Sequence, residues 1–533
     1  MHRRPLSRPE SPRRTAGGTG PWLALALMVA TPLAAQEVTP LSAIDWLRRG
    51  QNAGEPGAYP VTPPLTARDV AISVRALDAL RPEAVGLFPA ARVGLPATLW
   101  GPTPARTLAG QINDLPADML PALRDLSHRL LLAEFNAPLP DTTPAAAPDF
   151  LLARIDKLVE FGALDQAAAL LDTLDSPVPV LRLRRFDIAL LLGDEDRACT
   201  TITGNEPPIE DDAALIFCLA RAGDWEGAVA RLDATLAEHR MAPYLAELLT
   251  QFLHDEETLE GSPTLLPPPS GTPDPLTWRL REAVGDAQPS LGMPVAYAHA
   301  DLRGLQGWRS QIEAAERLTR VGALSPNRLL GLYTERRAAA SGGIWERVSA
   351  IQRLDTALRD GDAEAAGPAL LAAWPLVQAG ELEVAMAALF AQPLSQLTLT
   401  GEAQALAFRI GLLSPDYETV ALGLDTATAD PASRFLAAIA RGLDPAESRG
   451  ALPGELAGAV ALAFGAEPPL PPEMAERLAQ GRLGEEILRI LNALGGPGDP
   501  RLLAEGLSAL RALGLEDIAR RTALESLLLE RNG

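Results

Sequence analysis

The chain of 533 residues contains little of what β-sheets are usually built from. Aromatic residues make up only 5% of it, and its apolar residues are mostly alanine and leucine. Strands favour valine, isoleucine and aromatic side chains, whereas alanine and leucine favour helices that can pack closely. The composition therefore predicts an all-α protein.

The sequence also lacks the short motifs that mark common catalytic and cofactor sites. It has no Walker loop, no dinucleotide fingerprint and no Gly-x-Ser-x-Gly elbow. The five histidines, His2, His128, His239, His254 and His299, are not paired at the helical spacing of a metal site. We interpret them as ordinary surface or core residues and predict no cofactor, no metal and no enzymatic activity.

Positive charge is scarce. Lysines and arginines number 47 against 68 acidic residues, so the net charge is −21. Such a surface repels nucleic acid and anionic lipid; it suits a cationic protein partner, or it simply keeps the protein soluble. Lys157 is the only lysine, which together with abundant Ala, Arg, Gly and Pro indicates a GC-rich genome. The preference for arginine is therefore not interpreted as phosphate recognition.

The first 35 residues are typical of a cleavable secretory signal. Five arginines, the last two being Arg13 and Arg14, precede the apolar run "WLALALMVATPLAA", which ends at Ala35 in small residues. The arginine pair leaves open whether export is general secretory or twin-arginine. No later stretch approaches the ~20 apolar residues of a membrane helix. We expect a periplasmic protein with no membrane span after cleavage.

The only two cysteines, Cys199 and Cys218, fall on successive predicted helices on either side of the turn "TGNEPPIEDD". An antiparallel helical hairpin could bring them within bridging distance, and an exported protein meets oxidising conditions. The alternative is a pair of reduced, buried cysteines, because small offsets in helix register decide bridging.

A six-residue pattern, G-x-x-[DE]-x-A, recurs between apolar helical runs. It appears as "GALDQA", "GDEDRA" and "GDWEGA", with glycines 31 and 30 residues apart, and later at irregular spacing as "GDAEAA", "GELEVA" and "GLEDIA". A period near this length is typical of stacked helical hairpins. Glycine suits the left-handed position after a helix, the acidic residue suits the first turn of the next helix, and alanine permits close packing. The positions we assign to these turns are Gly162, Ala167, Gly193, Ala198, Gly223, Ala228, Gly361, Gly380, Ala385, Gly514 and Ala519. Trp225, inside the third copy, is predicted to pack at the corner of its hairpin.

These turns resemble those of tetratricopeptide-type helical hairpins, in which Gly, an acidic or aromatic residue and Ala occur at the same spacing. The resemblance covers about residues 149–245, with a shorter period than that family's 34 residues. It implies an α-solenoid. Longer phrases such as "IFCLARAGDWEGA" and "LLGLYTERRAAASGGIWERV" also resemble a group of uncharacterised alphaproteobacterial exported helical-repeat proteins, which supplies no activity.

The predicted fold is thus an all-α solenoid of tetratricopeptide-like hairpins with a small N-terminal β element, to which "DVAISVRAL", "AVGLF" and "GLPATLW" contribute. Helix starts are expected at Ser-Pro and Asp-Pro pairs such as Asp274-Pro275, Ser414-Pro415 and Asp430-Pro431. The predicted organisation is a signal peptide (1–35), a flexible segment (36–66), a small β/α region (67–135), a linker (136–148), a first helical array (149–258), a Pro-rich linker (259–275) and a second helical array (276–533).

One loop stands out as a candidate contact surface. "GLYTERRAAASGGIWERV" clusters Tyr333, Arg336, Arg337 and Trp345 around small residues, a mixture that is typical of protein interfaces. The alternative is a connection whose aromatic residues pack on adjacent helices.

Stacked hairpins create extended binding surfaces, so we expect a non-catalytic periplasmic scaffold or adaptor whose concave surface holds another cell-envelope protein. The alternative is a muramidase-like cell-wall enzyme or the direct activator of one. Some periplasmic muramidases join a helical superhelix to a catalytic lobe whose acid is a Glu followed by Ser. Two such pairs, Glu447-Ser448 and Glu525-Ser526, follow the signal segment, and neither has the expected context.

Overall fold

Capping side chains and prolines decide where several helices begin. The computed structural model describes residues 81–141, 148–174, 178–203, 209–253, 266–303, 306–338, 340–496 and 498–529. Within it, a carboxylate oxygen of Asp274 accepts a hydrogen bond from the backbone N–H of Thr277 at 2.8 Å, and Asp430 does the same for Ser433 at 3.0 Å. At Ser414-Pro415 the helix begins later, at Tyr417; the Ser414 hydroxyl donates to the carbonyl of Gly411 at 2.7 Å and accepts from the backbone N–H of Asp416 at 3.2 Å.

The elements confirm the all-α class. The first group is η1 (Pro82–Ala84), β1 (Phe88–Pro89), η2 (Ala90–Val93), α2 (Ala105–Asn113), α3 (Pro121–Leu132) and β2 (Ala133–Glu134). The next is α4 (Asp149–Glu160), α5 (Leu164–Asp172), α6 (Pro179–Leu192), α7 (Glu195–Thr203), α8 (Asp212–Arg221), α9 (Trp225–Ala237), α10 (Pro243–Leu253), α11 (Pro275–Ala283), η3 (Val295–Tyr297), α12 (Ala298–Asp301), α13 (Trp308–Arg320) and α14 (Pro326–Glu335). The last is α15 (Ile344–Asp360), α16 (Ala363–Gln378), α17 (Glu383–Ser395), α18 (Gly401–Leu412), α19 (Tyr417–Leu422), α20 (Pro431–Ala440), η4 (Ala446–Ser448), α21 (Glu455–Ala463), α22 (Met474–Ala479), α23 (Leu483–Leu494), α24 (Pro500–Ala512) and α25 (Glu516–Leu528).

The predicted β region contains very little strand where it is described. "DVAISVRAL" lies outside the described residues. Beyond it, Phe88 and Pro89 pair in parallel with Ala133 and Glu134, while residues 94–100, expected as a strand, form a turn. Proline lacks a backbone N–H, so it ends this short pairing and disfavours strands nearby.

Most of the predicted repeat turns use glycine in the left-handed conformation. The φ angles are 71° at Gly162, 81° at Gly193, 84° at Gly223, 67° at Gly361 and 78° at Gly514. "GELEVA" differs, since there Glu381 takes the positive φ of 52° in place of Gly380. A Cβ on Gly380 would lie 3.2 Å from the guanidinium carbon of Arg347 and 3.2 Å from Cδ1 of Leu382, so a larger residue there would require both side chains to shift slightly.

The acidic and alanine positions of the pattern also have structural roles. Acidic residues occupy the first turns of α5, α7, α9, α16, α17 and α25, where a negative charge interacts favourably with the helix dipole. Ala167, Ala198, Ala228 and Ala519 are fully buried, whereas Ala385 is half-buried. The pattern therefore combines a turn, a favourable charge and close packing in six residues.

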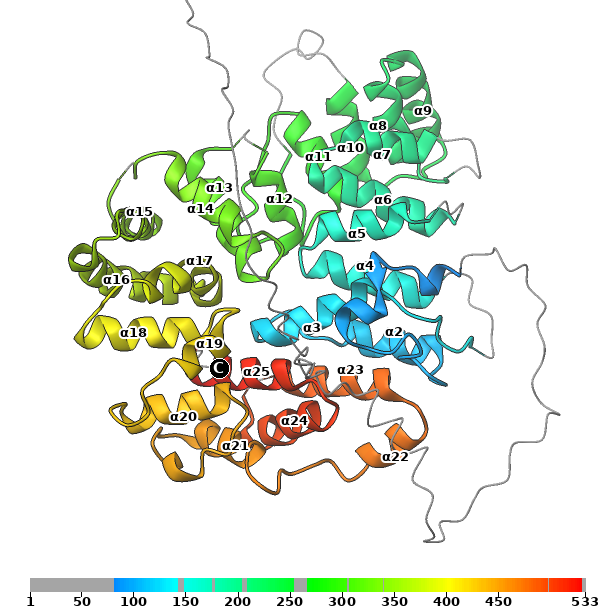
Figure 1. The fold of residues 1–533 in the computed structure, drawn as a ribbon. Coiled ribbons are helices and arrows are strands. Elements are labelled where there is room, and N and C mark those ends of the chain that lie inside the picture. The colour runs from blue at the N-terminus through cyan, green and yellow to red at the C-terminus, as the bar shows by residue number, and fades with distance from the viewer. Residues whose placement is uncertain are drawn as a thin grey trace, which may run out of the picture. The chain divides into compact units, whose positions relative to one another are not determined.

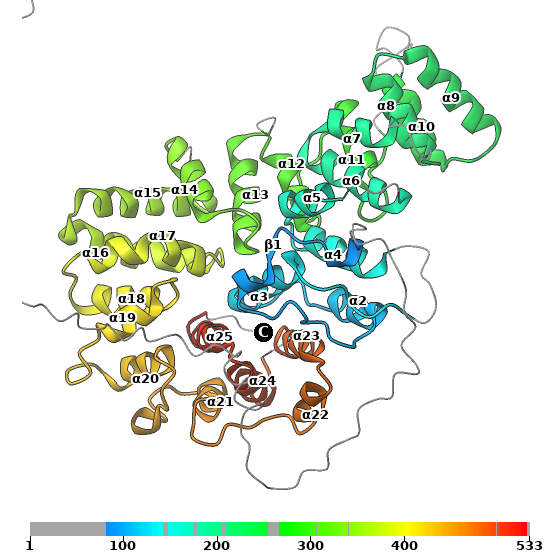
Figure 2. The ribbon, with the colours of Figure 1, turned by 45° about the vertical axis from the view of Figure 1, so that its right-hand side comes forward.

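Consecutive helices pack on one another, and the last helices also pack on the first. α23 contacts α2, and α25 contacts α3, which both views show (Figures 1 and 2). The backbone N–H of Gly484 donates to the carbonyl of Leu99 at 2.9 Å, and the amide of Asn492 donates to the carbonyl of Gln111 at 3.0 Å. One hydrophobic core joins Trp100 and its neighbours to residues of α23 and α24. The contacts therefore connect parts of the chain nearly 400 residues apart.

Two buried charged side chains hold helix ends in this region. Glu525, on α25, is 3% exposed, and its carboxylate accepts a hydrogen bond from the backbone N–H of Ala122 at 2.8 Å, in the first turn of α3. Lys157 donates to the carbonyls of Asn113 and Leu115 at 3.0 Å and 2.8 Å, beside the end of α2. The unpaired N–H groups at a helix start attract anions, and the carbonyls at a helix end attract cations. The Glu525 carboxylate at the start of α3 and the Lys157 ammonium at the end of α2 are therefore both favourably placed.

None of the helices in the described part of the chain is both long enough and apolar enough to cross a membrane.

Cys199 and Cys218 form a disulfide between α7 and α8. Their Cα atoms are 5.2 Å apart, and the Cys218 side chain is 1% exposed. Of the two alternatives that the sequence left open, the helix register thus favours the bridge. The bond links helices that also pack side by side along their length.

We expect that replacing both cysteines by alanine will lower the free energy of unfolding by about 3 kcal/mol, because the bridge restricts the unfolded chain. Urea unfolding of the exported protein and of C199A/C218A, each with and without reductant, measures this. Reductant should destabilise only the protein that retains the cysteines. Peptide mapping that finds both thiols free in exported protein would contradict the bridge.

Candidate functional site

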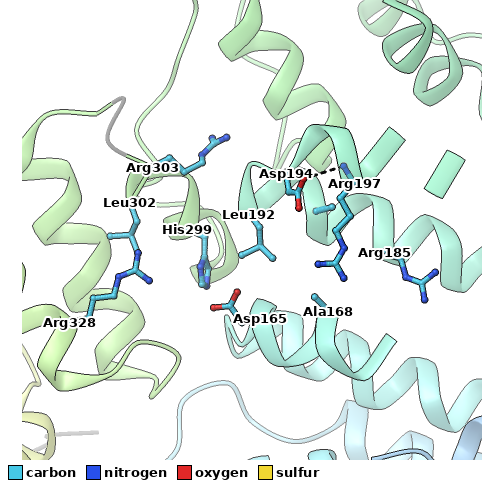
Figure 3. A pocket seen from close by; sticks show the side chains of 11 residues that line it. Asp165, Ala168, Arg185, Leu192, Asp194, Arg197, His299, Leu302, Arg303 and Arg328 are labelled. Carbon is cyan, nitrogen blue, oxygen red and sulfur yellow. Dashed lines mark hydrogen bonds between the residues drawn. The ribbon is translucent and has the colours of Figure 1, made fainter. Parts of the chain in front are cut away.

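A polar pocket of about 420 Å³ lies between α5, α6 and the start of α7 on one side and α12–α14 on the other (Figure 3). Its walls combine arginines with a few acidic and apolar side chains. The lining residues are Asp165, Ala168, Arg185, Ala189, Leu192, Asp194, Arg197, His299, Leu302, Arg303 and Arg328. We call this set the arginine pocket. It brings together elements from both predicted helical arrays.

The two carboxylates of the arginine pocket lie at helix starts. Asp194 precedes α7, and its Oδ1 accepts a hydrogen bond from the backbone N–H of Arg197 at 3.2 Å. Asp165 is in the first turn of α5. A helix start carries about half a positive elementary charge. Both carboxylates are thus partly compensated before any arginine is considered.

Three of the four arginines already contact protein groups. Arg185 donates through Nη2 to the carbonyls of Leu171 and Leu174, at 2.6 Å and 3.0 Å, and Arg197 pairs with Asp172. Arg303 donates to Glu282 at 2.8 Å and 3.1 Å. These contacts hold the side chains in place. Each guanidinium has five N–H donors, and some of them take no part in these bonds.

Arg328, on α14, differs from the other three. Its side chain is exposed and makes no hydrogen bond or ion pair with the residues that the structure describes. The Nε of Arg185 is buried, and it too makes no hydrogen bond within the described residues, although it lies 3.7 Å from a carboxylate oxygen of Asp172. The pocket therefore offers N–H donors from opposite walls (Figure 3).

His299 holds one side of the pocket to a repeat turn. Its Nε2 lies 2.7 Å from the carbonyl oxygen of Gly162, so Nε2 must carry the proton that it donates. Burial lowers the pKa of His299, opposed by that hydrogen bond and by Asp165. The ring is therefore uncharged near pH 7, and its hydrogen bond links α12 to the turn between α4 and α5.

A second pocket, of about 300 Å³, lies where α3 meets α13, α14, α17 and α25. Its lining includes Arg124, His128, Thr319, Arg320 and Leu324. Inside it, Nε2 of His128 and Oγ1 of Thr319 are buried and make no hydrogen bond with the described residues. Burial, and secondarily Arg124, lower the pKa of His128 from 6.5 to about 4. This histidine is consequently neutral in the folded protein near pH 7.

The predicted contact loop divides into buried and exposed residues. Tyr333 is fully buried and donates its hydroxyl proton to Glu316 at 2.6 Å, and burial raises its pKa well above the usual value. Trp345 is half-buried against Trp308, with ring centroids 5.0 Å apart. Arg336 and Arg337 are exposed, and Arg336 pairs with Glu335 at 3.0 Å. The aromatic residues therefore pack within the fold, and the role of the arginines in binding a protein stays a prediction.

Sequence reasoning did not identify the arginine pocket. Its residues are spread from position 165 to position 328, and no single motif joins them. Asp165, Asp194 and Arg197 lie in the repeat turns "GALDQA" and "GDEDRA", for which the sequence predicted a structural role, and His299 was interpreted as an ordinary core or surface residue. Across residues 81–529, leaving aside the segments that the structure does not describe, no cluster of three or more His, Cys, Asp or Glu side chains could hold a metal ion.

No protein-family model matches the chain, and neither a curated protein nor a solved structure shows significant similarity to it. Its function has to be inferred from its own residues.

Replacing His128 by phenylalanine should reduce the acid sensitivity of the fold. The unfolded chain takes up a proton on this histidine near pH 6.5 and the folded chain only near pH 4, so stability is lost as the pH falls between those values. The full effect of one proton is about 1.4 kcal/mol per pH unit. Urea unfolding at pH 7.5, 6.0 and 5.0 measures this. As the pH falls, the free energy of unfolding of H128F should rise relative to that of the natural protein.

The matched control is H239N, because His239 is exposed and has a positive φ of 53° that asparagine tolerates. The free energy of unfolding of H239N should change with pH as that of the natural protein does. A constant difference between H128F and the natural protein would show that His128 does not contribute to the pH dependence.

Proposed function

We propose that the chain is an exported, non-catalytic scaffold or adaptor built from tetratricopeptide-like helical hairpins, which binds another protein of the cell envelope. The observation that carries this proposal is an exposed apolar stripe on α9. Trp225, Val229 and Leu236 are 47%, 40% and 38% exposed. Their spacing places all three on one side of the helix.

The stripe adjoins the packed side of α9. Ala228, Leu232 and Thr235 are buried, and α9 packs against α8 and α10. Trp225 does not fill the corner of its hairpin, as the sequence suggested; its ring centroid lies 6.2 Å from that of Phe252, and about half of the residue stays exposed. α9 is therefore anchored on one side and presents large apolar side chains on the next.

An exposed tryptophan beside aliphatic residues is a common anchor of protein interfaces, because its burial removes a large apolar area from water. Location in the envelope is supported by the secretory character of residues 1–35 and by the disulfide, which is typical of oxidising compartments. The excess of acidic residues favours a partner that is not itself strongly acidic.

Photo-crosslinking in cells tests the stripe. A photoreactive amino acid at Val229 should capture one protein, whereas the same residue at Leu422, which is 62% exposed on α19, should not. With that partner purified, W225A should weaken binding at least tenfold but lower the thermal midpoint only slightly, because about half of Trp225 is exposed and the rest lies beside Phe252. Equal capture at both positions, or unchanged affinity of W225A, would contradict the proposed surface.

A muropeptide-release assay tests the absence of catalysis. We expect no sustained turnover on isolated cell walls, because the carboxylate of Glu525 caps α3 rather than facing a cleft. E525A should lose about 1–3 kcal/mol of stability, since it removes the acceptor of a buried N–H, whereas E525Q retains an acceptor and should lose less. Turnover by the natural protein that E525Q abolishes without loss of stability would overturn the proposal. The Ser526 hydroxyl bonds to the carbonyl of Ala523, and the side chain of Glu447 lies outside the described part of the chain.

A further inference from the structure

We propose that the arginine pocket binds a small molecule that carries at least two carboxylate or phosphate groups. This site is separate from the α9 stripe, and the proposal does not depend on what α9 binds. It follows from the charge of the lining, from the donors that remain available and from the size of the space.

The lining of the pocket is basic in a chain that is acidic as a whole. Four guanidinium groups face two carboxylates, whereas the entire chain carries a net charge of −21. Both carboxylates lie at helix starts, where the dipole offsets part of their charge. Arg303 and Arg197 have acidic partners, Glu282 and Asp172, but Arg328 has none among the described residues. Arg328 is therefore the one guanidinium of this lining without an acidic partner among the described residues.

The available donors lie on opposite walls. Arg328 comes from α14, while Arg185 and Arg197 come from α6 and α7 across the space (Figure 3). Guanidinium groups bind carboxylates and phosphates through paired N–H donors. A ligand with two anionic groups would thus satisfy donors on both walls.

The size and the remaining lining indicate a small organic molecule. The volume of about 420 Å³ lies within the range of small-molecule sites. Leu192, Leu302 and Ala168 provide short apolar surfaces between the charged groups. The neutral His299 ring adds no competing charge, and its bond to Gly162 holds this side of the pocket in place.

Isothermal titration of the full exported protein tests the site, with citrate as the carboxylate probe and pyrophosphate as the phosphate probe. At low ionic strength and pH 7 at least one of them should bind saturably with a stoichiometry of one, and acetate should bind at least tenfold more weakly. The tighter of the two probes identifies the anionic group. Absence of saturable binding by both would overturn the proposal.

The variant R328Q should weaken binding of the better probe at least tenfold with little change in the thermal midpoint, because the exposed Arg328 side chain makes no hydrogen bond or ion pair with the described residues. R336Q is the matched control, since Arg336 is also exposed but lies outside the pocket. R197Q provides a second test from the opposite wall and should also weaken binding. If R328Q and R336Q bind equally well, the anions attach to surface charge and the site is wrong.

Discussion

The contact between the first and last helices of the described chain limits how the helices between them can be arranged. Glu525 buries a carboxylate against the start of α3, and Gly484 brings its backbone within hydrogen-bond distance of Leu99. A buried carboxylate is costly unless it is paired, so this contact forms only when the two ends meet in register. An open stack of helical hairpins tolerates an added repeat, because each repeat contacts only its neighbours. Here an added hairpin would have to be accommodated without separating Ala122 from Glu525.

The sequence predicted the features that depend on nearby residues. The glycine turns at Gly193 and Gly223, the capping oxygens of Asp274 and Asp430, and the facing positions of the two cysteines all involve residues at most about 20 positions apart. Local backbone preferences and helix periodicity decide such features, and both can be judged from short stretches of sequence.

Features that join distant residues could not be predicted in this way. The bond from His299 to Gly162 spans 137 residues, and the bond from Ala122 to Glu525 spans 403. Nothing in the residues around either position marks its partner. The candidate site was missed for this reason, because its walls come from helices whose proximity is set by packing.

Arginine content illustrates why composition alone says little about binding. Arg154 is fully enclosed and donates to the carbonyls of Leu131 and Ala133, so it serves the fold. Arg303 is held by Glu282, whereas Arg328 has no partner among the described residues. All three are the same residue type in an arginine-rich chain. Only the surroundings of each guanidinium separate those that stabilise the fold from those that remain available to a ligand.

The disulfide connects the two surfaces to which we assign binding. Arg197 of the pocket and Cys199 lie on the same helix, α7, and Cys199 is bonded to Cys218 of α8, the helix against which α9 packs. Part of one wall of the arginine pocket and the support of the apolar stripe therefore belong to a single covalently linked pair of helices, so that the helices carrying Arg197 and supporting α9 are held together by a bond as well as by packing.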